Sequence, residues 1–340
     1  MRSPGAFVGM ATASDIRLDG KGIRPPMNGD ERMGGAMNTE TVVWPAKTRE
    51  VRNAYQDSTR WNGFEFRDGD VVVSTWAKTG TTWTQQIVWQ LLNGAPEGTF
   101  ETAVCPWVDM RPPDFAEMIA AVKAQTGRRC LKTHLPIDAL VYSPMAKYIF
   151  VGRDARDVTW SAYNHQAGYT DAAMAMLNGT PGRIGPPAAR PTGDVRQYYL
   201  DFLEHDEWPG FGGNPFWAHT QGWWDARHLP NLLLVHFANL KADLAGEVRR
   251  IADFIGVTLS EESLPAILAH CDIDYMREGA AAGRMATTWK DGSATFFNRG
   301  TNGRWRDVLS PAEIARCDEV AARRLTADCA HWLKTGRPAD

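Results

Sequence analysis

Residues 71–83 read VVVSTWAKTGTTW, and the helical pattern TQQIVWQLL follows directly. The apolar run predicts a buried strand, and the polar loop after it predicts a strand–loop–helix unit whose backbone N–H groups bind a phosphate. Lys78 adds a positive charge, Gly80 lets the backbone approach closely, and the threonines supply hydroxyl donors. The loop is not a Walker A motif, because Lys78 stands two residues before the glycine. Read alone, the stretch also fits an ordinary βα turn that carries a lysine.

The composition is that of a soluble globular protein, with 340 residues, of which 44% are hydrophobic and 23% charged. A formal net charge of −3 creates no global field toward nucleic acid, so we expect no nucleic-acid partner and a locally built anion site. The chain contains no run of 18 apolar residues and no signal-peptide core, so we expect no membrane span and a cytoplasmic location. The five cysteines form no C-x-x-C pair, which argues against a disulfide framework and a thiolate metal cluster.

Alternating strand and helix patterns predict one α/β domain, a P-loop-like fold with a central parallel β-sheet flanked by helices. We expect a disordered leader over residues 1–40 and the folded domain over residues 41–335. Predicted strands cover residues 71–75, 129–133, 147–152 and 231–237, and the clearest helices cover residues 82–93, 155–167, 194–205, 215–228 and 240–255. The proline- and glycine-rich stretch 178–193 predicts a mobile loop, either a lid or a disordered insertion.

Three further stretches carry candidate functional groups: CLKTHLP at 130–136, FVGRDARDVTWSAYNH at 150–165 and FFNRGTNGRWR at 296–306. Open α/β sheets bind ligands beyond the carboxyl ends of their strands, and the first two stretches include the ends of predicted strands. His134, expected near Lys78, is a candidate general base, although a lone histidine is often structural. Capping and surface ion pairs also explain the second stretch, and a charged turn explains the third.

Together these stretches resemble the motifs of the cytosolic sulfotransferase family, which transfers sulfuryl from 3′-phosphoadenosine-5′-phosphosulfate (PAPS) to alcohols, phenols or amines. The family's Y-P-K-S-G-T-T-W loop is matched by WAKTGTTW at 76–83, and its L-K-T-H-L-P segment is unchanged at 131–136. Its R-N-x-K-D-V-x-x-S-x-Y-H segment is matched at 153–165, and its late R-K-G-x-x-G-D-W loop looks like NRGTNGRW at 298–305. The chain looks like a bacterial small-molecule member.

The resemblance implies PAPS as co-substrate, no required metal, and a role for each matched residue. The 5′-phosphosulfate would be held by the loop residues Lys78, Thr79, Gly80, Thr81 and Thr82, and the adenine would stack on Trp83. The 3′-phosphate would be held by Arg153, Ser161, Arg299 and the backbone near Gly300. His134 would take the proton of the acceptor hydroxyl, while Lys78 and Lys132 would stabilise charge during an in-line displacement.

The chain departs from the family's pattern at three places on the cofactor side. Asn298 stands where the family has the first arginine of the late loop, so Arg304 or Arg306 is a candidate to replace that charge. Phe237 stands where the family often has a cofactor-contacting tyrosine, and CDI at 271–273 replaces a Thr-Ser-Phe segment. We find no family dimer motif, so the sequence leaves the oligomeric state open.

An aromatic-lined cleft would favour a small hydrophobic alcohol or phenol as acceptor over a glycan. Candidate lining residues are Trp107, Tyr163, Phe216 and Trp217. Two other functions stay open: a P-loop kinase or NTPase, and a catalytically inactive nucleotide-binding scaffold. The missing G-K-[ST] sequence argues against the first, and the presence of Lys78, Lys132 and His134 argues against the second.

Overall fold

The computed structural model describes residues 42–99, 104–111, 115–208, 214–281 and 285–339. The chain divides into two units, residues 1–41 and residues 42–340, and everything described here belongs to the second. The leader expected over residues 1–40 lies outside the described residues.

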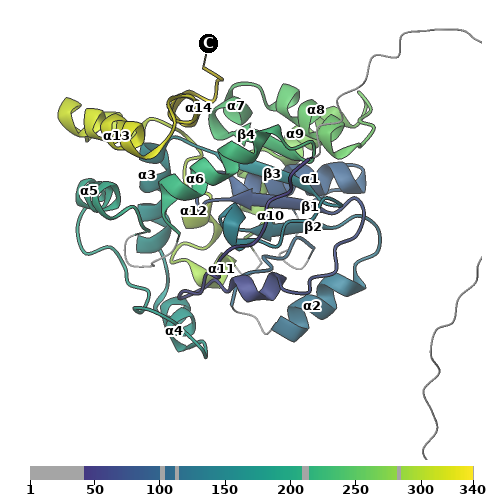
Figure 1. The fold of residues 1–340 in the computed structure, drawn as a ribbon, viewed down its shortest axis with the longest axis horizontal. Helices are drawn as coiled ribbons and strands as arrows, with labels where there is room; N and C mark the ends of the chain where they lie inside the picture. Colours follow the sequence, from purple (N-terminus) through teal and green to yellow (C-terminus); the bar gives the residue numbers. More distant parts are fainter. Residues whose placement is uncertain (1–41, 100–103, 112–114, 209–213, 282–284, 340) are drawn as a thin grey trace, which may run out of the picture. The chain divides into compact units, whose positions relative to one another are not determined.

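A parallel sheet forms the centre of this unit (Figure 1). Its strands are β1 (Val71–Thr75), β2 (Cys130–Thr133), β3 (Lys147–Gly152) and β4 (Leu232–His236), in the order β2-β1-β3-β4. Val73 of β1 lies opposite Lys132 of β2 and Ile149 of β3, so the carboxyl ends of these strands meet at one edge. The predicted α/β class with a central parallel sheet flanked by helices is confirmed.

Helices surround this sheet on both faces (Figure 1). The longer helices are α1 (Thr81–Asn93), α2 (Phe115–Ala124), α3 (Ala155–Ala167), α4 (Asp171–Gly179), α5 (Val195–His205), α6 (Phe216–Asp225), α8 (Leu244–Ile255), α13 (Pro311–Arg324) and α14 (Ala327–Thr335). Shorter ones are α7 (Phe237–Ala242), α9 (Leu264–His270), α10 (Ile273–Gly279), α11 (Met285–Thr288) and α12 (Ser293–Phe296). The 3₁₀ turns are η1 (Ser58–Trp61), η2 (Ile137–Ala139), η3 (Ala226–His228) and η4 (Arg304–Asp307).

The strands separate two hydrophobic cores, because alternate side chains of a strand point to opposite faces. Val73 and Ile149 pack with Ile87 of α1 and Ile251 of α8 in one core. In the other core, Val72, Tyr148 and Phe150 pack with residues of α3, α5 and α6. Burial on both faces explains why the strands are short and largely apolar.

The stretch predicted as a mobile loop, 178–193, begins inside a helix, since α4 extends to Gly179. Residues 180–193 contain no helix or strand, but other segments anchor them: Arg111 donates to the Thr180 and Pro181 carbonyls, and Arg190 donates to the Tyr169 carbonyl. No residue from 180 to 193 lines the cavity described below. In the structure, residues 180–193 are thus held by side chains of other segments and lie outside the cavity lining.

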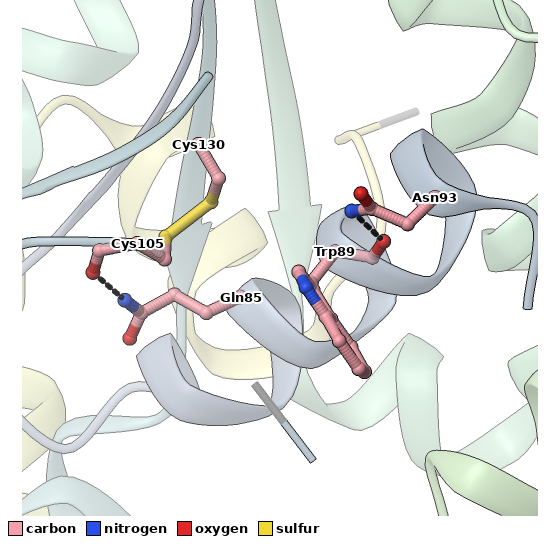
Figure 2. The surroundings of a disulfide bond; sticks show 5 residues. All are labelled: Gln85, Trp89, Asn93, Cys105 and Cys130. Atoms are coloured by element: carbon pink, nitrogen blue, oxygen red, sulfur yellow. Dashed lines mark hydrogen bonds between the residues drawn. A yellow bond between two sulfur atoms is a disulfide. The ribbon is translucent and has the colours of Figure 1, made fainter. Parts of the chain in front are cut away.

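Cys105 and Cys130 form a disulfide, contrary to the expectation from the odd cysteine count. Figure 2 shows the bond beside α1, where Gln85 donates to the Cys105 carbonyl. The pairing forms because the chain after Cys105 runs along β2: Lys132 N–H donates to the Pro106 carbonyl and Val108 N–H donates to the Lys132 carbonyl. The 25-residue separation along the sequence hides this adjacency.

Among the described ranges, no helix combines the length and apolar character that crossing a bilayer requires.

Candidate active site

A cavity of about 490 Å³ opens at the carboxyl edge of the sheet. Its lining includes Lys78 from the loop after β1, Lys132 and His134 from the end of β2, Arg153 after β3 and Phe237 after β4. Each of the four strands is thus followed by, or ends in, one or two side chains that line this cavity. This edge is where open parallel sheets bind their ligands.

The loop between β1 and α1 has positive φ angles at Lys78 and Gly80. Lys78 adopts a left-handed conformation with φ of 70°, which is uncommon for a residue with a side chain. Gly80 has φ of 123°, and a Cβ there would lie 3.0 Å from the Phe237 ring, so this position requires glycine. The loop leads into the N-terminus of α1, where Thr81, Thr82 and Trp83 line the cavity and unused N–H groups favour an anion.

Thr79 belongs to the same loop but does not line the cavity. Its hydroxyl donates to the Trp76 carbonyl and is buried, so its side chain stabilises the turn.

The polar end of the cavity concentrates positive charge. Burial, together with the charges of Arg153 and Lys132, lowers the pKa of Lys78 to about 7. Burial lowers the pKa of Lys132 to about 8 and that of Arg153 to about 10. Among the described residues, the ion pairs include none of these three cations. Desolvated cations that make no close ion pair are costly, and an anionic ligand would offset that cost.

A contact with β1 determines which ring nitrogen of His134 carries the proton. Nδ1 lies 2.7 Å from the Thr75 carbonyl oxygen, which only accepts hydrogen bonds, so Nδ1 carries the proton and Nε2 keeps its lone pair. Burial and the nearby charge of Lys132 hold the pKa of His134 well below 6.5. The side chain is therefore neutral near pH 7, the state in which a histidine accepts a proton.

Trp107 forms a wall beside these groups. Its ring lies edge-on to His134 with 4.5 Å between centroids, and Lys132 Nζ lies 4.2 Å from its centroid. Asp109 Oδ2 accepts from Trp107 Nε1 at 2.7 Å and from the His134 N–H at 3.3 Å. The segment that the disulfide joins to β2 therefore orients both Lys132 and His134.

Arg153 is held over an aromatic face. Its guanidinium carbon lies 4.0 Å from the Phe237 centroid, a cation–π contact that uses the ring standing where a tyrosine was expected. The guanidinium also donates to the Lys78 carbonyl at 3.1 Å and to Asn302 Oδ1. Arg153 thereby joins the loop after β1 to the late loop 298–304.

The late loop contributes the rest of this end. Asn298, Arg299 and Gly300 of this loop line the cavity, as do Ser161 of α3 and Arg304, which donates to Asn298 Oδ1 at 2.9 Å. Gly300 has φ of 61°, and a Cβ there would meet Ile273 at 2.4 Å. Asn298 stands where the family pattern has an arginine, and the guanidinium group of Arg304 lies beside Asn298.

His165 is a buried group that the sequence did not single out. Nδ1 lies 3.0 Å from Lys78 Nζ, and Nε2 lies 3.0 Å from the Tyr169 hydroxyl. Both ring nitrogens are thus engaged, unlike those of His134. The sequence signal was weak, because the histidine of the family pattern falls on Asn164 and His165 lies one position later, in the last turn of α3. Spacing alone does not show its contact with Lys78.

The other half of the cavity is aromatic and apolar. It is lined by Tyr55, Trp107, Met110, Tyr169, Ala173, Met176, Leu177, Trp208, Met285, Trp289 and Phe296. Phe296 connects the halves, because Lys78 Nζ lies 4.8 Å from its ring centroid.

Three of the four expected acceptor-side residues lie elsewhere, and only Trp107 lines the cavity. Phe216 and Trp217 are 0% and 1% exposed, because α6 directs them into the core beside Phe202. Tyr163 packs edge-on against Tyr198 of α5. The structure corrects the expectation for these three residues.

Among the described residues, no group of three or more His, Cys, Asp or Glu side chains is arranged to hold a metal ion.

Comparisons with known proteins show the family of this chain. A family model described as "Sulfotransferase domain" matches residues 68–328. A glycolipid sulfotransferase of Mycobacterium bovis (strain BCG / Pasteur 1173P2) is 32% identical over 326 residues, covering 88% of this chain and 98% of the relative. Sulfotransferase 1A1 of Rattus norvegicus is 28% identical over 275 residues, covering 76% and 85%.

Solved structures share the fold. Retinol dehydratase in complex with androsterone and the inactive cofactor PAP superposes with a TM-score of 0.61 at 22% identity, covering 79% of this chain and 84% of that one. Mouse sulfotransferase SULT7A1 complexed with PAP gives a TM-score of 0.60 at 17% identity, covering 80% and 90%.

Proposed function

The chain belongs to the sulfotransferase domain family and is a sulfotransferase, and from this premise we propose that it moves a sulfuryl group from PAPS to the hydroxyl of a hydrophobic acceptor. The observation that carries the proposal is the division of one cavity into a cationic end and an aromatic half, with His134 among its lining residues. PAPS supplies an activated sulfuryl group on a phosphate leaving group.

The residues at the cationic end fit this donor. The β1–α1 loop with Lys78 and the N-terminus of α1 would hold the 5′-phosphosulfate, and Arg153 with Ser161, Arg299 and Arg304 would hold the 3′-phosphate. The structural support is that Lys78, Lys132 and Arg153 line this cavity and that desolvation lowers the pKa values of all three. Trp83, edge-on to Phe237 at 5.5 Å, would contact the adenine.

His134 acts in this proposal as general base through Nε2. It accepts the proton of the acceptor hydroxyl while Nδ1–H stays on the Thr75 carbonyl. Lys132, held against Trp107, and Lys78 stabilise the negative charge that develops on the transferring and departing oxygens. A sulfuryl group carries one negative charge, so fixed protein cations are sufficient in principle.

The acceptor is a hydroxyl compound with an apolar body, because the half of the cavity beyond His134 is lined mainly by aromatic and apolar side chains. A glycolipid is the specific alternative to a small alcohol or phenol. It is favoured by the relative that is 32% identical over 88% of this chain, whose name gives a glycolipid as its substrate class.

A transfer assay tests the proposal. The protein is incubated with sulfur-35 PAPS and three acceptor sets: phenols, hydrophobic alcohols and glycolipids in micelles. We expect label in an apolar hydroxyl compound, and labelling that is slower by about 10²–10⁴-fold with His134→Ala. Label in water-soluble glycans alone would contradict the acceptor class, and no transfer to any set, together with no binding of adenosine 3′,5′-bisphosphate, would contradict the donor.

A further inference from the structure

Lys78 is the first of three side chains in a partly buried chain of polar contacts. Its Nζ lies 3.0 Å from Nδ1 of His165, and Nε2 of the same ring lies 3.0 Å from the Tyr169 hydroxyl. All three residues line the cavity where its cationic end meets its aromatic half. The contact therefore connects a proposed donor-binding lysine to the acceptor side.

The protons of this chain can be assigned from donor and acceptor chemistry. An ammonium group only donates, so Nδ1 of His165 accepts from protonated Lys78, and Nε2–H then donates to the Tyr169 oxygen. Because both nitrogens are engaged, His165 is not free to take a proton from an acceptor hydroxyl. It differs in this respect from His134, whose Nε2 keeps its lone pair.

The ring of His165 is fixed by its neighbours. The Trp289 ring lies 4.9 Å away between centroids and the Phe296 ring 5.7 Å away. Trp289 Nε1 also donates to the His165 carbonyl at 3.1 Å. A ring held in this way presents Nδ1 in one direction, toward Lys78.

We propose that His165 is a positioning residue for Lys78: its Nδ1 lone pair holds the ammonium group in place and keeps it charged until an anionic donor binds. The inference rests on the proposed function, because it assigns Lys78 to the donor. His165 thereby gains a role in the reaction. The family motifs quoted above give it no role, and neither does the proposed acceptor site.

The surrounding charges explain why Lys78 needs a hydrogen-bond acceptor such as Nδ1 of His165. Arg153 and Lys132 face Lys78 and oppose its charge, and burial opposes it further, so its pKa is lowered to about 7. His165 itself faces Lys78, Lys132 and His134, and burial with these neighbours holds its pKa well below 6.5. A neutral imidazole thus supplies a hydrogen-bond acceptor in surroundings that otherwise disfavour an ammonium ion.

Proton uptake during ligand binding tests the proposal directly. An anionic ligand favours charged Lys78, so binding adenosine 3′,5′-bisphosphate above pH 7 should take up a proton. Calorimetric titrations at several pH values, in buffers of different ionisation enthalpy, count that proton. Lys78→Met identifies the part of the uptake that belongs to Lys78, since Lys132 also titrates near this range.

Two substitutions of His165 separate positioning from packing. His165→Leu removes the acceptor, and we expect the Lys78-dependent uptake curve to move to lower pH by about one unit. His165→Asn places an amide oxygen near the position of Nδ1, and we expect it to restore the curve. If His165→Leu does not fold, His165→Phe takes its place, because it keeps a ring against Trp289 and Phe296. We expect the same shift of the uptake curve to lower pH.

The outcomes are distinguishable. An uptake curve that is the same in wild type and His165→Leu, or the same in wild type and Lys78→Met, would overturn this inference while the ligand still binds. Failure of the wild-type protein to bind the bisphosphate would instead overturn the proposed function. A shifted curve in His165→Leu with recovery in His165→Asn would support both.

Discussion

The carbonyl oxygen of Thr75 lies 2.7 Å from Nδ1 of His134, and this contact decides which nitrogen of the ring can accept a proton. Thr75 ends β1 and His134 follows β2, and these strands are neighbours with Ser74 opposite Thr133. The register of the sheet therefore sets the tautomer of the proposed base. No additional carboxylate is needed to orient the ring.

Replacing His134 by alanine should lower kcat by about 10²–10⁴-fold, the usual contribution of a general base. Affinity for adenosine 3′,5′-bisphosphate should change little, because the donor contacts come from Lys78 and Arg153. Turnover and calorimetry on the same preparation measure the two effects. A variant that unfolds would show that His134 is structural, and one that keeps full turnover would contradict its role as general base.

Replacing Arg153 by alanine should weaken the bisphosphate by roughly tenfold to a hundredfold, because a charge-assisted hydrogen bond contributes about 1.5–3 kcal/mol. Adenosine 5′-monophosphate, which lacks the 3′-phosphate, should lose much less affinity. Arg306→Ala is the matched control, since Arg306 packs on Trp305 and does not line the cavity. If Arg153→Ala lowered the affinity for both nucleotides equally, Arg153 would not be the group that binds the 3′-phosphate.

The value of kcat/KM for PAPS should fall as the pH rises from 7 to 9. Lys78 and Lys132 have pKa values of about 7 and about 8, so the free enzyme loses both cations over this range. The pKa of His134 lies well below 6.5, so its basic form persists on the acid side. The assay uses an alcohol as the sulfuryl acceptor, because an alcohol does not ionise in this pH range. A value of kcat/KM that increases toward pH 9 would contradict the lysine assignments.

Lys78→Met should stabilise the ligand-free protein near pH 7, by about 1–4 kcal/mol in free energy of unfolding. The pKa of Lys78 is lower in the folded state than in the unfolded state. The destabilisation by its buried charge is therefore complete below pH 7 and is relieved as the pH rises toward the unfolded value. Denaturant unfolding at pH 6.5 and pH 9.5 measures this, and a larger gain at pH 9.5 would contradict it.

Removing the disulfide with Cys105→Ser and Cys130→Ser should lower the free energy of unfolding by about 2–4 kcal/mol. Turnover should fall as well, because Trp107 and Asp109 orient Lys132 and His134. Thermal unfolding with and without a thiol reductant provides the measurement. Reductant should destabilise the wild type and leave the double variant unchanged, and an effect on both would point to another cause.

The sequence predicted the parallel sheet because strands buried on both faces read as short apolar runs, and β1 and β3 have the predicted bounds. It also predicted which loops meet, because functional groups that follow parallel strands come to the same edge. Lys78, Lys132, His134 and Arg153 line one cavity for that reason.

The sequence failed where side-chain direction or long-range pairing decides. Phe216 and Trp217 are aromatic residues of a helix, and periodicity does not tell a core-facing helix position from a cavity-facing one. The Cys105–Cys130 bond depends on a loop that runs beside β2, which no local pattern encodes. His165 was missed because its role depends on its contact with Lys78, 87 residues away.

The central claim is that this cavity binds a 3′-phosphorylated adenosine donor, and calorimetric titration tests it most directly. Adenosine 3′,5′-bisphosphate and ATP are titrated in parallel, without added metal and in EDTA. The account predicts tight binding of the bisphosphate and none of ATP. Binding of ATP that needs Mg²⁺, or binding of neither ligand, would contradict it.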